Sequence, residues 1–194
     1  MMRRFFILTL LCLGLFLTGC GKPWKVIQQA EPNPFIGKKE FVVMPVDYSG
    51  LMVGSKTEEE YLSEKKDKTV DSFQADKVDM NSLVLDNMRS VASKNGVKIA
   101  TAEGEVTTFV IKPHIPFMEP GFYAVVVSKA SEVKMRLKIE DKDGKLLDEI
   151  ETRHQTPPSN WGNVASGSRY RSDAEAIGKI VGRYISERVM GTEP

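Results

Sequence analysis

Apolar and polar residues alternate most regularly between Glu132 and Glu140, which predicts a strand with one buried face and one solvated face. Asp141-Lys142-Asp143-Gly144 supplies turn residues, and Lys145–Thr152 is expected to return as the partner strand of a hairpin. The turn resembles part of a calcium loop, but Lys145 and Leu146 stand where such a loop needs a ligand and a glycine. We therefore expect no metal there.

A first helix is predicted between Lys77 and Asn95. Its apolar residues recur at helical spacing, at Met80, Val84, Met88 and Val91. Asn95-Gly96 supplies a left-handed stop of the kind that ends helices. Gly96 is therefore expected to have a positive φ.

A second, closing helix is predicted to begin at Ser172–Glu175, which resembles a capping box. One face of this helix would carry Ile177, Val181, Tyr184 and Arg188. Gly178 and Gly182 are four residues apart and are expected to let the helix approach a sheet closely. The preceding segment, His154–Arg171, is rich in Pro, Gly and Ser and is predicted to be a long loop.

Three shorter apolar runs predict further strands: Phe41–Val46, Val97–Ala100 and Val106–Ile111. Between the first two of these lies Ser49–Gln74, a stretch of mixed charge. It is predicted to be either a mobile loop or a helical insert that faces solvent.

The chain upstream of Glu40 shows little apolar periodicity. Residues 20–39 contain Pro23, Pro32 and Pro34 and are predicted to be a flexible tether that reaches up to about 60 Å. Trp24 within it would lie either at the level of lipid headgroups or against its own domain.

The first nineteen residues have the pattern of a secretory signal. A basic head, Met1-Met2-Arg3-Arg4, precedes the apolar run Phe5–Leu17, in which only Thr9 and Gly14 intervene. The run is shorter than the roughly 20 residues that cross a bilayer as a permanent helix. We expect residues 1–19 to be removed.

The cleavage region, Leu17-Thr18-Gly19-Cys20, resembles the lipobox of bacterial lipoproteins. This resemblance implies cleavage between Gly19 and Cys20 and attachment of acyl chains to Cys20, which would hold the protein on a membrane without spanning it. Because Gly21 rather than aspartate follows the cysteine, it also implies sorting to the outer membrane of a Gram-negative cell in preference to the inner membrane.

Charge and cysteine content narrow the classes of function. Without Arg3 and Arg4 the chain carries 25 basic and 26 acidic side chains, so no nucleic-acid partner is expected. Of the two cysteines, Cys12 leaves with the signal and Cys20 is acylated. No thiol then remains for a disulfide or a metal site, and no cofactor is indicated.

The order of elements predicts an α+β domain over residues 40–194. It would have a mixed or antiparallel sheet of about four to five strands, with two main helices on one face. Phe41–Val46, Asn95-Gly96-Val97, Glu119-Pro120-Gly121 and Val133–Leu147 resemble segments of the group that includes the amino-terminal domain of TolB, penicillin-binding-protein activators and the curli secretion lipoprotein. The resemblance implies a periplasmic accessory or assembly protein of the envelope.

Aromatic residues in two loop regions are the candidates for binding an envelope protein. They are Phe122 and Tyr123 after Pro120-Gly121, and Trp161 and Tyr170 in the later loop. The alternative for each is packing on the core of its own domain.

Catalysis is not indicated by any motif, and the protein is predicted not to be an enzyme. The mature chain has two histidines, His114 and His154, and lacks the motifs of hydrolases and of phosphate-binding loops. The alternative is an envelope hydrolase of unfamiliar design. It would require His154, an acidic residue and either Ser166 or Ser168 to meet.

Overall fold

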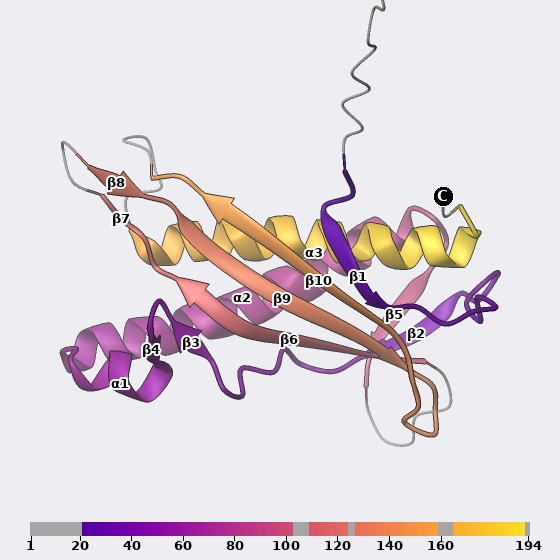
Figure 1. Cartoon of the computed structure of the whole chain (residues 1–194), viewed down its shortest axis with the longest axis horizontal. Helices are drawn as coiled ribbons and strands as arrows, with labels where there is room; N and C mark the ends of the chain where they lie inside the picture. Colours follow the sequence, from indigo (N-terminus) through magenta and orange to yellow (C-terminus); the bar gives the residue numbers. More distant parts are fainter. Residues whose placement is uncertain (1–20, 103–108, 124–126, 159–164, 193–194) are drawn as a thin grey trace, which may run out of the picture.

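The fold is described from a computed structural model that covers residues 21–102, 109–123, 127–158 and 165–192. A strongly twisted sheet carries two long helices against the same face (Figure 1). In chain order the elements are β1 (Trp24–Gln28), β2 (Glu40–Val43), β3 (Met52–Val53), β4 (Lys56–Thr57), α1 (Glu58–Ser63), α2 (Asp67–Ser93), β5 (Lys98–Thr101), β6 (Phe109–Glu119), β7 (Phe122–Tyr123), β8 (Ser128–Lys129), β9 (Ser131–Glu140), β10 (Leu146–Thr156) and α3 (Ser166–Met190).

The main sheet of the described chain has eight strands. Six follow the order β1-β10-β9-β6-β2-β5, while β3 pairs with β6 and β4 with β3. β2 lies parallel to β5 and β6, whereas β9 is antiparallel to both β6 and β10. The predicted α+β class and mixed sheet are confirmed. The predicted four to five strands are too few, because β1 and the short strands β3 and β4 have no alternating apolar pattern.

The predicted hairpin is present as β9 and β10. Val133, Met135, Leu137 and Ile139 are all buried, and Leu137 lies opposite Ile150. In the turn, Asp141 Oδ1 accepts the backbone N–H groups of Asp143 (3.0 Å) and Lys145 (2.9 Å), and Gly144 has a φ of 81°. The Asp141 carboxylate is therefore used to close the turn.

Helix α2 is longer than predicted and includes part of the charged segment. Upstream of it, Thr57 and Glu60 form a reciprocal capping box that starts α1. Lys77 of α2 pairs with Glu58 of α1 at 2.8 Å. Of the two predictions for Ser49–Gln74, the helical insert is thus the observed one. At the other end, Gly96 has a φ of 73°, as predicted.

Helix α3 begins at Ser166, so the predicted start at Ser172 is wrong, and so is half of the predicted loop, residues 154–156 and 166–171. Strand β10 continues to Thr156, and only residues 157–165 connect it to α3. Ser172 lies inside the helix, where its hydroxyl donates to the carbonyl of Ser168 at 3.1 Å. A serine can bond to the preceding turn as well as cap a helix, and this makes the two positions hard to distinguish in a sequence.

Two glycines of α3 lie against α2 and not against the sheet as predicted. A Cβ on Gly178 would be 2.6 Å from the carbonyl oxygen of Val84, and one on Gly182 would be 2.7 Å from that of Met88. The two helix backbones therefore approach more closely than side chains at these positions would permit.

The predicted tether is wrong for residues 22–39, because this segment is part of the fold. β1 pairs with β10, and Trp24 packs edge-on against Tyr184 with ring centroids 5.6 Å apart. Phe35 is fully buried between Phe41 and Phe109. Trp24 is only 9% exposed, so the alternative in which it packs on its own domain is the observed one.

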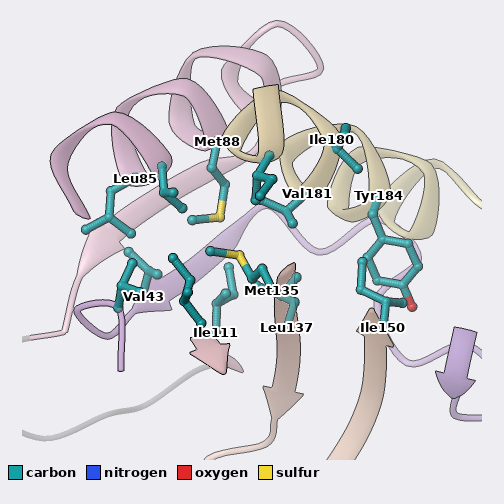
Figure 2. Packing of buried hydrophobic residues seen from close by; sticks show 14 of the residues in the cluster. Val43, Leu85, Met88, Ile111, Met135, Leu137, Ile150, Ile180, Val181 and Tyr184 are labelled. Atoms are coloured by element: carbon teal, nitrogen blue, oxygen red, sulfur yellow. The ribbon is translucent and has the colours of Figure 1, made fainter. Parts of the chain in front are cut away.

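The core lies between the two long helices and the sheet. Figure 2 shows Leu85 and Met88 from α2 and Val181 and Tyr184 from α3 pointing toward side chains of the strands. The strand side chains that meet them are Val43, Ile111, Met135, Leu137 and Ile150.

The close contact between α2 and α3 can be tested with Gly182→Val. The added side chain has no room beside Met88 and Val91, so we expect the free energy of unfolding in urea to fall by about 2 kcal/mol or more. Ser90→Val places the same side chain on the exposed side of α2. This control should change the free energy of unfolding by about 0.5 kcal/mol. Equal stabilities of the two variants would contradict the close approach.

Candidate functional site

Of the four aromatic residues predicted to bind a partner, the structure describes the side chains of Phe122 and Tyr170; the first is exposed and the second is buried. Gly19, Cys20 and Trp161 lie outside the described residues. Phe122 is in β7 and is 48% exposed. Tyr123 follows it in the same strand, and its side chain lies outside the described part of the structure.

Tyr170 belongs to the core, so of the two alternatives for this residue, packing on its own domain is the observed one and partner binding is not. It is 1% exposed, because residues 166–171 are helical and place it on the buried face with Ala174 and Ile177. Burial raises the pKa of its hydroxyl above the ordinary value. Its neighbour Arg169 is equally buried and donates from Nη2 to the carbonyl of Pro120 at 2.7 Å.

The region around β7 and β8 is the more exposed candidate for partner binding. These two short strands form a separate two-stranded sheet that extends beyond the end of the main sheet (Figure 1). Besides Phe122, Val127 is 61% exposed there. Gly121 joins this hairpin to β6 with a φ of 60°, and a Cβ at that position would lie 2.4 Å from the carbonyl oxygen of Lys129. Glycine is therefore required to bring the hairpin this close.

His154 does meet an acidic residue, as the hydrolase alternative requires. Its Nδ1 lies 2.8 Å from Oδ1 of Asp173, a carboxylate that is completely buried between β10 and α3. The same carboxylate accepts the hydroxyls of Thr156 and Ser131, each at 2.6 Å. Asp173 is thus surrounded by three side-chain donors from the two long hairpin strands.

The serines in this part of the structure are not arranged for attack on a substrate. A nucleophilic serine must donate to a histidine that an acid orients, but Ser131 donates directly to Asp173. Ser168 donates to the carbonyl of Ala165 at 2.8 Å. Neither Ser166 nor Ser168 has a hydrogen bond to His154 among the described contacts. The arrangement instead stabilises the packing of α3 on β10.

The other histidine, His114, lies on the face of the sheet away from the long helices. Its Nε2 is 2.9 Å from the carbonyl oxygen of Ser49. Nearby, hydrogen bonds from the hydroxyl and backbone N–H of Ser49 lower the pKa of Asp47 below its ordinary value, and His114 adds to this effect. These contacts fix the loop between β2 and β3. No group of three or more metal-ligating side chains occurs among the described residues.

A buried ion pair that the sequence did not indicate fixes the N-terminal segment. Arg188 of α3 donates from Nε to Oδ2 of Asp148 in β10 at 2.7 Å, and both side chains are at most 1% exposed. Tyr184 donates to the same oxygen at 2.6 Å. Ala30 donates its backbone N–H to Asp148 and accepts Nη2 of Arg188 through its carbonyl. The chain between β1 and β2 is thereby bound to the interior.

The surface on both sides of β1 is hollowed and rich in basic side chains. On the sheet side, a hollow next to Lys22 and Trp24 is lined by Lys25, Lys134 and Arg153. On the helix side, a second hollow is lined by Lys179 and Arg183 together with Gly21. The first described residues of the chain therefore lie among basic side chains from β1, β9, β10 and α3.

The comparisons with known proteins give no family. No protein-family model and no curated protein match the chain, and none of its described helices has the length and apolar character to span a membrane. Among solved structures it is similar to a PelC dodecamer from Paraburkholderia phytofirmans, with 12% identity, a TM-score of 0.42 and coverage of 81% of this chain and 96% of that one. It is also similar to a DUF330 protein from Xanthomonas campestris, with 10% identity, a TM-score of 0.45 and coverage of 82% and 92%.

These similarities are too distant to carry an inference about activity or assembly. The resemblance to the TolB group, the predicted lack of catalysis and the predicted envelope location all stay predictions.

The structural role of Asp173 is testable. Asp173→Ala should lower the free energy of unfolding by about 3 kcal/mol or more, because the buried hydroxyls of Ser131 and Thr156 lose their acceptor. His154→Ala should cost about 1 kcal/mol, since His154 is partly exposed. Glu175→Ala, on the exposed side of α3, is the control and should change the free energy of unfolding by about 0.5 kcal/mol. An Asp173→Ala protein as stable as this control would contradict the assignment.

Proposed function

We propose that the mature chain is a lipoprotein, held on a membrane by acyl chains on Cys20, that acts as a non-catalytic binding module in the bacterial cell envelope. The observation that carries the proposal is the run Phe5–Leu17 followed by Leu17-Thr18-Gly19-Cys20. The thiol of Cys20 is the group that can accept the lipid. Gly21 after it favours the outer membrane, with the domain in the periplasm.

The start of the folded chain supports this proposal. Thr152 of β10 donates its hydroxyl to the carbonyl of Pro23 at 2.8 Å, and Trp24 packs on Tyr184. Residues three and four positions after Cys20 are therefore already part of the packed domain.

A binding role is supported by the location of the exposed apolar side chains near β7 and β8. Phe122 and Val127 have no part in the core, and exposed aromatic residues contribute much of the energy of protein–protein contacts. We therefore propose that the β7–β8 hairpin contacts an envelope protein.

Lipidation is tested with Cys20→Ser in a Gram-negative host. Serine lacks the thiol, so we expect the variant to incorporate no labelled palmitate. We also expect the variant protein to leave the membrane fraction without detergent. The wild-type protein and Cys12→Ser, whose changed residue lies within the proposed signal, should both be labelled. Label that still enters Cys20→Ser would refute acylation at this residue.

The proposed contact is tested by crosslinking intact membranes and quantifying the envelope protein that the wild-type protein captures. Phe122→Ala should weaken that capture by about 30-fold, which corresponds to about 2 kcal/mol, and should leave the melting temperature within about 1–2 °C of the wild type. Val78→Ala is the matched control, because Val78 is 67% exposed on α2. Equal capture by the two variants would show that Phe122 is not part of the interface.

A further inference from the structure

The site of lipid attachment lies close to the folded domain. Trp24 is buried, and Pro23 is bound through its carbonyl to Thr152. Four residue steps separate Trp24 from Cys20, so their Cα atoms are at most about 14 Å apart. If Cys20 is acylated, as proposed above, the membrane surface must lie next to the start of β1 and cannot be far from the domain.

Basic side chains surround the first described residues of the chain. We call this set the N-terminal basic surface; it consists of Lys22, Lys25, Lys134, Arg153, Lys179 and Arg183. Only two acidic residues, Glu151 and Glu187, line the same hollows. Without Arg3 and Arg4 of the proposed signal the chain has 25 basic and 26 acidic side chains, so these hollows are more positive than the chain as a whole.

Ion pairs within the protein offset part of this charge. Lys22 pairs with Glu187 at 2.8 Å and Lys179 with Glu175 at 2.5 Å. Lys134 and Arg153 share Glu132 as their partner, at 3.8 and 3.9 Å. Such pairs on the surface are weak, because water and salt screen them. Lys25 and Arg183 are exposed, and no ion pair to another described residue is found for either. An excess of positive charge therefore stays available to an external anion.

We propose that the N-terminal basic surface lies against the anionic headgroups of a phospholipid bilayer and gives the anchored domain a fixed orientation. The proposal rests on the lipid anchor proposed above. Basic residues within about one Debye length of an anionic membrane, roughly 8 Å at physiological salt, are attracted to it. Because the chain between Cys20 and the domain is short, Lys22, Lys25 and Lys179 lie near enough to the membrane for this attraction. Their flexible aliphatic stems allow the ammonium groups to reach the headgroups.

The other end of the domain would then face away from the bilayer. In Figure 1 the start of β1 lies at the top, whereas α1 and the turn between β9 and β10 lie at the bottom. Lys68, at the beginning of α2, and Lys142, in that turn, are both exposed. These two lysines provide an internal reference within the same molecule.

The orientation can be measured on the full mature protein in vesicles. The protein is reconstituted into phosphatidylcholine alone or with phosphatidylglycerol, treated with a water-soluble acetylating reagent, and analysed by mass spectrometry. We expect acetylation of Lys25 and Lys179 to fall about fivefold in the anionic vesicles, and to recover in 0.5 M NaCl. Acetylation of Lys68 and Lys142 should not depend on the lipid. Equal acetylation of Lys25 and Lys179 in both lipids would overturn the proposal.

Charge reversal provides the second arm of the test. Lys179→Glu/Arg183→Glu should restore acetylation of Lys25 in anionic vesicles to its value in neutral vesicles. Lys68→Glu/Lys142→Glu makes the same change in net charge elsewhere and should leave the protection of Lys25 intact. Loss of protection in both double variants would show that net charge, and not this surface, determines the orientation, and would overturn the proposal.

The same spectra separate this proposal from the proposed anchor. The mass of the N-terminal peptide reports whether Cys20 carries acyl chains. If it carries none, lipidation is refuted and the surface is tested by flotation of the unacylated protein. Flotation with anionic but not neutral vesicles would support the basic surface, and its absence with both would overturn it.

Discussion

The buried pair of Asp148 and Arg188 is the interaction that joins the N-terminal segment to the rest of the fold. Burying two charges costs several kcal/mol per ion unless their hydrogen-bonding groups are satisfied. Here Asp148 accepts from Arg188, Tyr184 and the backbone of Ala30, and Arg188 also donates to the carbonyl of Ala30. Its guanidinium lies 5.4 Å from the ring centroid of Phe35. The pair is thus satisfied only when residues 30–35 are in place.

This dependence explains how a segment with few apolar residues becomes part of the domain. β1 buries a single side chain, Trp24, and the other four residues of the strand are exposed. An isolated edge strand of this kind is weak. The polar contacts made by Ala30, and the burial of Phe35 beyond it, hold both ends of the connection between β1 and β2. The proposed lipid attachment site is consequently kept close to the domain.

The sequence predicted those elements whose pattern is set locally. The alternation in β9, the turn at Gly144 and the end of α2 at Gly96 depend on neighbouring residues, and the structure contains all three. Tyr170 could not be assigned in this way, since Gly167 and the serines around it favour a loop. The partners of Asp148 and Asp173 lie 17 to 118 residues away in the chain. Only the tertiary arrangement shows that these carboxylates are buried and satisfied.

Two buried carboxylates together determine how α3 lies on β10. Asp148 in the strand binds Arg188 in the helix, and Asp173 in the helix binds Thr156 in the strand, so the two elements run in opposite directions. From 148 to 156 the strand advances by about 26 Å, at about 3.3 Å per residue. From 173 to 188 the helix advances by about 22 Å, at 1.5 Å per residue. The nearly equal lengths allow both contacts to form at once. A shift of α3 by one turn would separate Asp148 from Arg188 and Tyr184, and Asp173 from Thr156 and Ser131.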